Sequence, residues 1–424
     1  MKKILIISSF LMVMMSFSMI GYKMVSATEK VDEIEEQLEF QKKQEKYFSP
    51  YGYTLDNPNI IENPYATSPL TALILFETDY STKVTVKILS KENLPLENTY
   101  SEDTKHIIPI YGLYPNTENK IEIITSKEKK TYHLKTKNIE SFSSINEVDS
   151  SINKLTIEQK NNKLYGVDEN KEIRWYYQNN VELPPYLLEN GHLLLEVNNN
   201  YRHTLIEIDL LGKIYKQMNL EKKVTDIKEV NNILYLLEDD LIKLDWQTGK
   251  IIANYNLEDK YTSIESIKDD IVTLGNDSKE SVLNMKTRIE KVTTTENKII
   301  SHSLKMNYYQ DNTNYKLTNG IIFQNNIKTP LSQKNILLVN YKKIDNTYNK
   351  YNVTLKKTKD TILLTGKFKK DEEVYLILDK FLDKRIYDIK SNTTIINQYG
   401  LEGKYSIYLK INNTIYKTNT YITI

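Results

Sequence analysis

Residues 231–255 read NNILYLLEDDLIKLDWQTGKIIANY, and this stretch decides the fold. Two asparagines lead into an apolar run, an acidic turn and a second apolar run, and the turn at 247–250 leads into a third. Residues 190–218, NGHLLLEVNNNYRHTLIEIDLLGKIYKQM, repeat the pattern. The runs alternate or stay apolar for about five residues and then break, which is typical of strands; a helix would place apolar residues at i, i+3 and i+4.

Asp209 and Asp245 mark equivalent turns of the two units, which places the repeat at about 40 residues. Weaker copies of the same pattern occur upstream, over 164–175, and downstream, over 281–292. Short strands joined by polar turns at this period are typical of propeller blades. We therefore predict an all-β fold with β-propeller-like repeats over 154–345, and a solenoid is the alternative.

The composition limits the function. Lysine and arginine total 57 and aspartate and glutamate total 56, so no basic footprint points to nucleic acid as a partner. Cysteine is absent, which excludes disulfides, thiolate nucleophiles and thiolate metal sites. With only 12 glycines, the turns rely on Asn and Asp. The 32 tyrosines fit β-rich packing, with stacking platforms for sugars or phenols as the alternative.

The N-terminus resembles a secretion signal over 1–27. Lys2 and Lys3 precede an apolar stretch from Ile4 to Ile20, and small residues favour cleavage after Ala27. The alternative is an uncleaved membrane anchor of marginal length, which would be the only membrane contact. A lipoprotein anchor would need a cysteine. In either case we expect an extracytoplasmic location, secreted or associated with the cell envelope.

A helical leader is predicted over 28–54, with Val31, Ile34 and Leu38 on one face. We expect it to dock on a neighbouring domain or on a partner subunit, which would make a homodimer. Residues 55–138 contain five strand-like runs and predict a β-sandwich. In this reading 70–76 and 84–88 are separate strands.

Two further segments complete the organisation. Residues 139–153, rich in Ser, Asn and Glu, form the expected linker into the repeats. Residues 350–424 hold another set of strands, which could be a C-terminal β-sandwich-like domain or the strands that close the propeller. We favour the separate domain.

Three stretches together resemble the bacterial aryl-sulfate sulfotransferases. The most specific is NPYATSPLTAL over 63–73, followed by IPIYGLYP over 108–115. NGHLL over 190–194 with the strand and turn after it is the second, and NGIIFQNN over 319–326 is the third. The resemblance implies a secreted protein with an N-terminal β-sandwich and a six-bladed propeller. It also implies transfer of a sulfuryl group between phenols through a sulfo-histidine, without a nucleotide donor.

The residues that this chemistry needs are replaced. The family's His-His-Asp-Ile is matched by Val224, Thr225, Asp226 and Ile227, and Ser263 stands where the next blade of the family has a histidine. No arginine occurs between Arg202 and Arg288, so the family's charge clamp is also missing. A nucleophilic imidazole and cations on the transferred oxygens are both required.

Five histidines remain, and we weigh each for catalysis. His106 and His133 lie in predicted sandwich strands, and His192 matches a structural position of the family. His203 lies in an Asn-rich loop, and His302 precedes the third family stretch roughly where the last active-site histidine is expected. The candidate catalytic residues are therefore His302, His203 and Asp226.

Other classes of site have no support in the sequence. No metal-ligand spacing, phosphate loop or Gly-x-Ser-x-Gly elbow is present, so we expect no metal and no cofactor. The acidic stretch 238–240 is expected to be a solvated turn. Two hypotheses remain: a binding or scaffold protein with a degenerate catalytic site, and an active sulfotransferase that uses His302. A phenolic or aryl-sulfate small molecule is the expected ligand in both.

Overall fold

The chain is described by a computed structural model. It describes residues 33–89, 96–140, 156–168, 172–188, 192–199, 202–276, 279–294, 306–308, 310–311, 314–316, 323–324, 344–345, 351–359, 361–389, 391–398, 400–412 and 414–424. The predicted signal sequence and His302 lie outside these residues. None of the helices in the described part of the chain is long and apolar enough to span a membrane.

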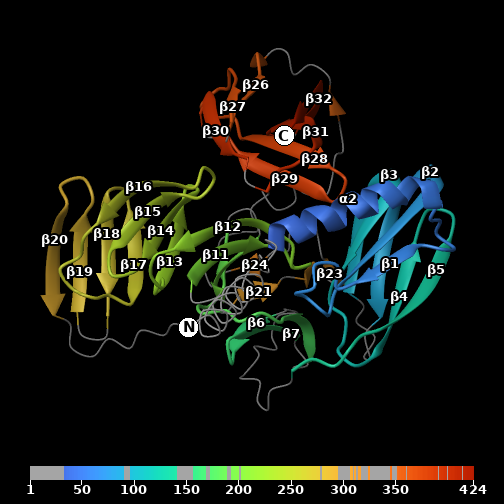
Figure 1. The fold of residues 1–424 in the computed structure, drawn as a ribbon, viewed down its shortest axis with the longest axis horizontal. Helices are drawn as coiled ribbons and strands as arrows, with labels where there is room; N and C mark the ends of the chain where they lie inside the picture. The colour runs from blue at the N-terminus through green and yellow to red at the C-terminus, as the bar shows by residue number, and fades with distance from the viewer. Residues whose placement is uncertain are drawn as a thin grey trace, which may run out of the picture.

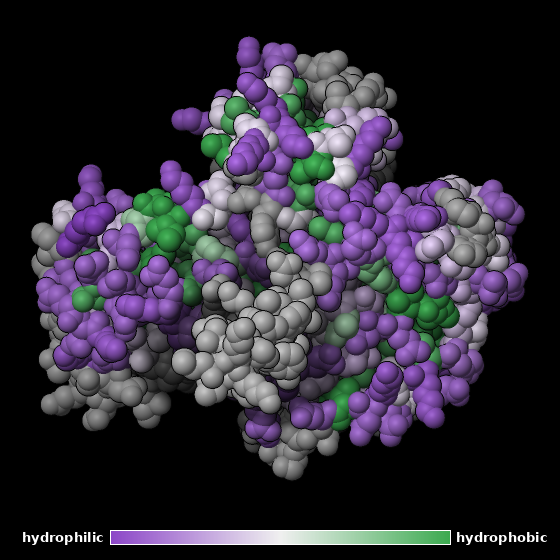
Figure 2. Space-filling model, in the orientation of Figure 1, coloured by the Kyte–Doolittle hydropathy of each residue, from purple (hydrophilic) through white to green (hydrophobic). Residues whose placement is uncertain are grey.

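The all-β prediction is confirmed. Apart from one helix, α2 (Glu33–Tyr51), the described elements are strands. Figure 1 shows several sheets around the helix, with the N-terminal sheet on one side, a row of sheets on the other and the C-terminal strands above. Hydrophilic residues cover most of the face in Figure 2, so the apolar runs of the sequence are largely internal.

The N-terminal domain is built on two long strands that pair with each other. Its elements are β1 (Asn59–Glu62), β2 (Ala72–Leu89), β3 (Leu96–Ile110), β4 (Glu118–Ile124) and β5 (Lys129–Lys135). With β22 (Gln310–Asp311) and β23 (Asn314–Lys316) they form one sheet in the order β22-β23-β3-β2-β4-β5, with β1 on β2. The separation of 70–76 from 84–88 is wrong, because β2 continues through both. Residues 77–83 contain no Gly or Pro to end a strand, and the register with β3 shifts between Glu77 and Thr82 instead.

The repeats form antiparallel sheets of neighbouring strands. The first sheet has β6 (Thr156–Lys160), β7 (Lys163–Val167) and β8 (Ile173–Tyr177), extended by β21 (Met306–Tyr308) and β24 (Phe323–Gln324). The second sheet has β9 (Tyr186–Leu187), β10 (Leu193–Asn199), β11 (Arg202–Ile208) and β12 (Ile214–Leu220). The third has β13 (Asp226–Val230), β14 (Ile233–Leu237), β15 (Leu241–Asp245) and β16 (Lys250–Tyr255), and the fourth has β17 (Ser263–Lys268), β18 (Ile271–Gly275), β19 (Lys279–Asn284) and β20 (Ile289–Thr294).

The second, third and fourth sheets stand side by side in a row that ends at β20 (Figure 1). Strand β14 shows why they stack. Leu234 and Leu236 join the core between the second and third sheets, while Tyr235 and Leu237 join the core between the third and fourth. Successive side chains of a strand point to opposite faces, so a strand buried on both faces must be apolar throughout. The run ILYLL therefore has no polar alternation.

Asparagine serves the tight turns, as the scarcity of glycine suggests. Asn231 and Asn232 join β13 to β14 with φ of 55° and 64°, and Asn161 and Asn162 join β6 to β7 with φ of 50° and 59°. Two-residue hairpins favour turns with positive φ at both positions, which Asn tolerates better than most residues. These pairs set the register of the strands on either side.

The C-terminal strands form two sheets with a core of their own. β25 (Ile344–Asp345), β28 (Val374–Lys380), β29 (Asp383–Asp388), β31 (Lys404–Ile411) and β32 (Thr414–Thr423) form the order β25-β32-β31-β28-β29. β26 (Thr354–Lys357), β27 (Thr361–Thr365) and β30 (Thr393–Asn397) form the second sheet. Apolar residues of both, such as Leu364, Leu376 and Leu409, make one cluster.

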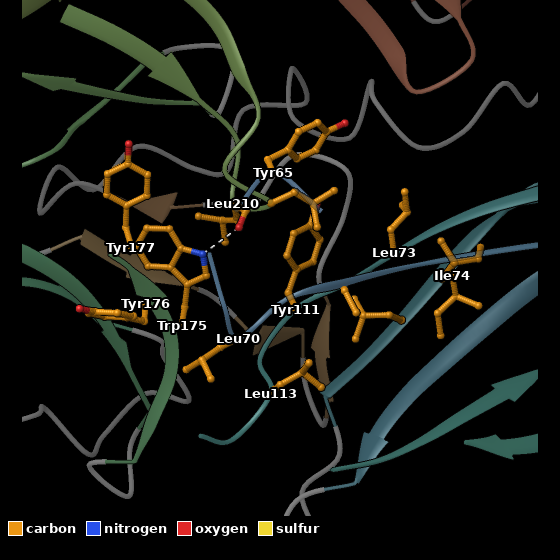
Figure 3. Packing of buried hydrophobic residues seen from close by; sticks show 14 of the residues in the cluster. Tyr65, Leu70, Leu73, Ile74, Tyr111, Leu113, Trp175, Tyr176, Tyr177 and Leu210 are labelled. Carbon is orange, nitrogen blue, oxygen red and sulfur yellow. Dashed lines mark hydrogen bonds between the residues drawn. The ribbon is translucent and has the colours of Figure 1, made fainter. Parts of the chain in front are cut away.

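The motif that carries the family resemblance joins the N-terminal domain to the repeats. One apolar core runs from β2 into β8 and β12, and within it Trp175 Nε1 donates to Leu210 O at 2.9 Å (Figure 3). Thr67 Oγ1 donates to Gly212 O at 3.2 Å. Gly212 has φ of 85°, and a Cβ there would lie 1.9 Å from Thr67 Oγ1, so only glycine fits.

Arg174 of β8 binds the stretch IPIYGLYP, residues 108–115. Its Nε donates to Gly112 O at 2.9 Å and its Nη1 to Tyr114 Oη at 3.1 Å. The same Nη1 lies 3.1 Å from Asp168 Oδ2, and the guanidinium lies over the Tyr114 ring. The turn at 112–114 is therefore the place where the N-terminal domain binds the repeats. This structural role accounts for Gly112 and Tyr114 without a part in catalysis.

A buried ionic cluster joins the C-terminal sheets to the second sheet. Asp383 Oδ1 lies 2.6 Å from Lys213 Nζ and 2.7 Å from Arg385 Nε, and Arg385 Nη1 donates to Tyr215 O at 2.6 Å. Tyr405 Oη donates to the other oxygen of Asp383. We call Lys213, Asp383, Arg385 and Tyr405 the junction cluster.

Helix α2 fills the space where these parts meet. Gln37 Oε1 accepts from Ile214 N at 2.9 Å, the Phe48 and Phe381 rings are 5.2 Å apart, and Phe40 packs on Tyr65 at 5.5 Å. The helix thus contacts the second sheet, the C-terminal domain and the N-terminal domain. Its contacts are intramolecular, and the expected homodimer stays a prediction.

Candidate functional site

The loop into β13 occupies the place where the resemblance puts a pair of histidines. Val224 is fully buried in the core between the second and third sheets. Thr225 Oγ1 donates to Leu237 O at 2.9 Å, and the Thr225 amide donates to the same oxygen at 2.6 Å. Val224 has no nucleophilic atom, and the Thr225 hydroxyl is already hydrogen-bonded to the backbone. Neither residue replaces the nucleophilic imidazole.

Asp226 begins β13 and faces the fourth sheet. Its Oδ2 accepts from Ile264 N at 2.7 Å and its Oδ1 from Ile227 N at 2.8 Å. Ser263, the residue at the next histidine position of the family, donates its Oγ to Glu265 Oε1 at 2.8 Å and lies 3.3 Å from Gly275 O. Asp226 therefore ties β13 to β17, and Ser263 is bonded within its own sheet.

His203 lies in β11 and not in a loop. Its Nδ1 is 2.9 Å from Glu196 Oε1, without the angle of a hydrogen bond, and its side chain is 27% exposed. Glu196 in β10 is 1% exposed. Glu196 Oε1 also accepts from Val224 N at 3.4 Å, so His203 and the loop into β13 meet at this carboxyl.

A second carboxyl, that of Glu238, lies close enough to Glu196 for the two charges to interact. Glu196 follows Leu194 by two residues in β10, so both side chains lie on the face that packs against the third sheet, and Glu238 stands in the turn directly after β14. Glu238 is only 9% exposed, so the expectation of a solvated turn over 238–240 is wrong for this residue. We call Glu196 and Glu238 the carboxyl pair.

The protonation of the pair follows from its burial. Burial raises the pKa of Glu196 to about 7, against lowering by the Val224 amide and Lys223. Burial also raises the pKa of Glu238 to about 7; Lys222 lowers it and the Glu196 carboxylate raises it further. Burial of both carboxyls therefore favours their neutral forms at a higher pH than in water.

The other histidines have structural surroundings. His192 Nδ1 lies 2.7 Å from Glu207 Oε1, and Trp246 Nε1 donates to the other oxygen of Glu207 at 2.7 Å. His106 stacks on Phe76 and is nearly buried, which lowers its pKa. His302 lies outside the described residues, so its place relative to His203 and Asp226 stays a prediction.

The chemistry open to this region is limited by its charge. Within the described residues no group of three or more His, Asp or Glu side chains could hold a metal ion. The buried side chain that accepts from the Val224 amide is the Glu196 carboxyl, which supplies no positive charge to a sulfate ester in either protonation state. A cradle for a sulfuryl group would need cations or amide donors in their place.

A comparison with known families adds to this geometry. Residues 59–140 match the model of the arylsulfotransferase Ig-like domain. The resemblance to the aryl-sulfate sulfotransferases is confirmed. The match covers the N-terminal domain with its docking motif and stops before the repeats. No curated protein matches the chain.

Several solved structures align with much of the chain at low sequence identity. BamB from Moraxella catarrhalis aligns with 61% of this chain and 77% of its own at 11% identity and a TM-score of 0.25. Sqt1 of Saccharomyces cerevisiae covers 60% and 79% at 10% identity and 0.26, and AztD of Citrobacter koseri covers 82% and 88% at 9% identity and 0.23. At these TM-scores the likeness says nothing about function.

Glu196 and Glu238 were not among the residues predicted from the sequence. A pattern that could have identified them is present, because each repeat has a glutamate directly after its apolar run: LLLE over 193–196 and ILYLLE over 233–238. A carboxylate directly after an apolar run that is buried on both faces is expected to be buried with it, and burial raises its pKa.

Proposed function

We propose that this chain is an extracytoplasmic binding or scaffold protein, built on the aryl-sulfate sulfotransferase plan with a degenerate catalytic site. The N-terminal family match and the secretion-like N-terminus support the location. The ligand class that the family suggests is a phenol or an aryl sulfate, bound without transfer.

One observation carries the proposal: the position of the family's histidine pair is filled by Val224 and Thr225. Val224 packs in an apolar core, and the Thr225 hydroxyl is already bonded to Leu237 O. Neither side chain can accept a sulfuryl group by the route of an imidazole nitrogen. The substitution therefore removes the nucleophile and also builds a structural contact in its place.

The electrostatics of the same region support the loss. A transferred sulfuryl group develops charge on its oxygens, which the family resemblance would place near cations. Here the buried side chain that accepts from the Val224 amide is Glu196, and no arginine lies between Arg202 and Arg288 in the sequence. The arginine that would stabilise the transferred oxygens is therefore missing from this stretch.

The test is a transfer assay on the full purified chain. The chain is mixed with a nitrophenyl sulfate and a phenol acceptor, and nitrophenol release is followed by absorbance. We expect release equal to that of buffer. The matched variants are His302→Ala and His203→Ala, which should then change nothing. Turnover by the chain that His302→Ala abolishes would establish the active sulfotransferase instead.

Binding separates a ligand site from a pure scaffold. Isothermal titration with the nitrophenyl sulfate and with the free phenol measures whether either associates with the chain. Heat that saturates with ligand supports the binding role. Absence of heat with both compounds confines the proposal to a scaffold.

A further inference from the structure

The five-stranded sheet of the C-terminal domain has one face in the domain core and one face turned away from it. Tyr405, Ile407 and Leu409 of β31 belong to the core that the two C-terminal sheets share. Side chains alternate along a strand, so the even-numbered residues of β31 lie on the other face. Figure 1 shows β31 and β32 on one side of the domain and β26, β27 and β30 on the other. We use the name outer face for the lysines and tyrosines that β31 and β32 place there: Lys404, Tyr408, Lys410, Lys417 and Tyr421.

The register of the two strands brings lysines and tyrosines of the outer face together. Lys417 of β32 lies directly opposite Tyr408 of β31, and its Nζ is 5.9 Å from the centre of that ring. Tyr421 lies opposite Ser406, and the Nζ of Lys404 is 4.2 Å from the centre of the Tyr421 ring. Two cation–π pairs therefore join neighbouring strands on one face of the sheet.

The outer face is exposed at one end and covered at the other. Lys410 lies opposite Tyr375 of β28, with its Nζ 5.9 Å from that ring, but Tyr375 is only 5% exposed. At the end formed by β31 and β32, Lys404 and Lys417 are exposed and Tyr421 is 57% exposed. Contact with one lysine uses only part of a ring, so more than half of the Tyr421 side chain is open to a ligand.

The lysines of the outer face have no carboxylate in contact with them. Among the described residues, none of the three forms an ion pair within 4 Å. The carboxylates around them pair with other lysines: Glu402 Oε1 lies 2.9 Å from Lys42 Nζ, and Asp379 Oδ1 lies 3.9 Å from Lys384 Nζ. Charges of Asp379 and Glu373 reach the outer face without contact. The positive charge of this face is therefore only partly offset.

The composition of the domain has the same sign. Residues 350–424 hold 14 lysines and arginines against 8 aspartates and glutamates, although the whole chain is balanced at 57 against 56. An excess of one sign within one domain of a balanced chain attracts ligands of the opposite sign to that domain. The complement of the outer face is therefore anionic.

We propose that the outer face binds an anionic polysaccharide, with Lys404 and Lys417 on its charged groups and Tyr421 packed against a sugar ring. Lys404 and Lys410 are six residues apart in one strand, or about 20 Å, which is long enough for several units of a linear polymer. An aromatic ring offers an apolar surface to the C–H face of a sugar, and the phenol of Tyr421 can bond to its hydroxyls. The site lies in the C-terminal domain and does not depend on whether the repeats transfer a sulfuryl group.

The residue types favour a polysaccharide over a nucleic acid. Arg385 is the one arginine in the sequence of 350–424, and it belongs to the junction cluster. The outer face therefore has no planar fork to hold a phosphate in two hydrogen bonds. Lysine acts as a point charge on a flexible stem, which suits a polymer whose anionic groups are not held in one fixed geometry.

The test compares polymers that share charge or sugar but not both. Binding of the full chain is measured by biolayer interferometry to immobilised polygalacturonate, to neutral dextran, to polyglutamate and to oligothymidylate. We expect binding to polygalacturonate that weakens as salt is added, because exposed charges are screened, and none to dextran. Polyglutamate also carries one carboxylate per unit but no sugar ring, and it should bind more weakly. Absence of binding to polygalacturonate, or equal or tighter binding to polyglutamate or oligothymidylate, would overturn the proposal.

Variants of exposed side chains assign the binding to the outer face. Lys404→Gln/Lys417→Gln should weaken binding to polygalacturonate about fivefold or more, since each exposed charge pair contributes up to about fivefold. Tyr421→Ala should weaken it by about fivefold or more, whereas Tyr421→Phe keeps the ring and should keep most of the affinity. The melting temperatures should equal that of the parent, because the changed side chains are exposed.

The matched control is Lys268→Gln/Lys286→Gln, which removes two exposed lysines from the fourth sheet and the turn after β19. It changes the net charge by the same amount and should leave the affinity unchanged. An equal loss in this control would show that binding follows the net charge of the chain. Unchanged affinity in Tyr421→Ala would contradict packing of a sugar on this ring.

Discussion

The junction cluster and the carboxyl pair are both buried, and they handle charge in opposite ways. Asp383 sits between two cations, and although burial alone would raise its pKa, Arg385 and Lys213 hold it well below the usual range. Glu196 has the His203 ring at 2.9 Å and the charge of Lys223, and Glu238 has the charge of Lys222, but burial outweighs these groups and the pKa of both carboxyls rises to about 7. A buried carboxylate between two cations stays ionised, whereas a carboxyl whose burial is not offset by its neighbours has a pKa near neutral pH.

The two cations of the junction cluster differ in how strongly their charge is stabilised. Burial lowers the pKa of Lys213 to about 8, and Asp383 only partly restores it because Arg385 shares the same carboxylate. Arg385 donates to Asp383 and Gly400 O within its own domain and to Tyr215 O across the junction, while Lys213 donates across it to Asp383 and Leu382 O. Both cations therefore hold the C-terminal domain to the second sheet.

The largest effect is expected from Asp383→Asn. It leaves Lys213 and Arg385 buried without a counter-charge, which should lower the free energy of unfolding by about 3 to 5 kcal/mol. Urea denaturation followed by circular dichroism measures it. Asp371→Asn, at an exposed position, is the control and should change the free energy by less than about 0.5 kcal/mol. Equal effects of the two variants would contradict the account of the junction cluster.

Gly212→Ala sharpens the comparison at the N-terminal junction. Its Cβ would collide with Thr67 Oγ1 and would also be strained at φ of 85°, so we expect a loss of about 2 to 3 kcal/mol. Gly52→Ala shares the left-handed backbone, at φ of 58°, but has nothing within 4 Å, and it should lose about 1 kcal/mol. The difference measures the collision, and Thr67→Ala in the Gly212→Ala background should recover part of it.

Replacing Glu196 by glutamine should stabilise the protein at alkaline pH. The folded pKa values of the carboxyl pair, about 7, lie above the ordinary 4.5, so the folded state binds more protons and the unfolding free energy falls as pH rises from about 4.5 to about 7. Glu196→Gln removes that loss. We expect about 1 to 2 kcal/mol more stability at pH 8 and no change at pH 4. A Gln variant that is less stable at pH 8 would show that the ionised carboxylate is the form the fold uses.

The sequence predicts the strands well wherever burial on both faces leaves a continuous apolar run, as in 233–237, and the turns wherever two asparagines stand together. It did not predict the continuation of β2 through 77–83, since a bulge leaves no composition mark. The family motif at 63–73 was recognised, but its role as a docking surface for Gly212 depends on residues about 145 positions apart.

Some properties of the candidate residues could be predicted from the sequence, and others depend on contacts made only in the fold. Thr225 and Ser263 could be read as lost histidines because the replacement is visible in the sequence. The partner of His203 could not be read, because Glu196 lies on another strand and becomes buried only when two sheets stack. Asp226 was expected near catalysis, yet its carboxylate bonds the backbone of the next sheet.

The central claim is that this scaffold has kept its structure and lost its sulfuryl acceptor. Intact-mass spectrometry of the full chain after incubation with a nitrophenyl sulfate alone tests it most directly, because a working site would retain the sulfuryl group in the absence of an acceptor. The account predicts an unmodified mass. A sulfo-adduct that maps to a histidine, and that disappears when a phenol is added, would contradict it.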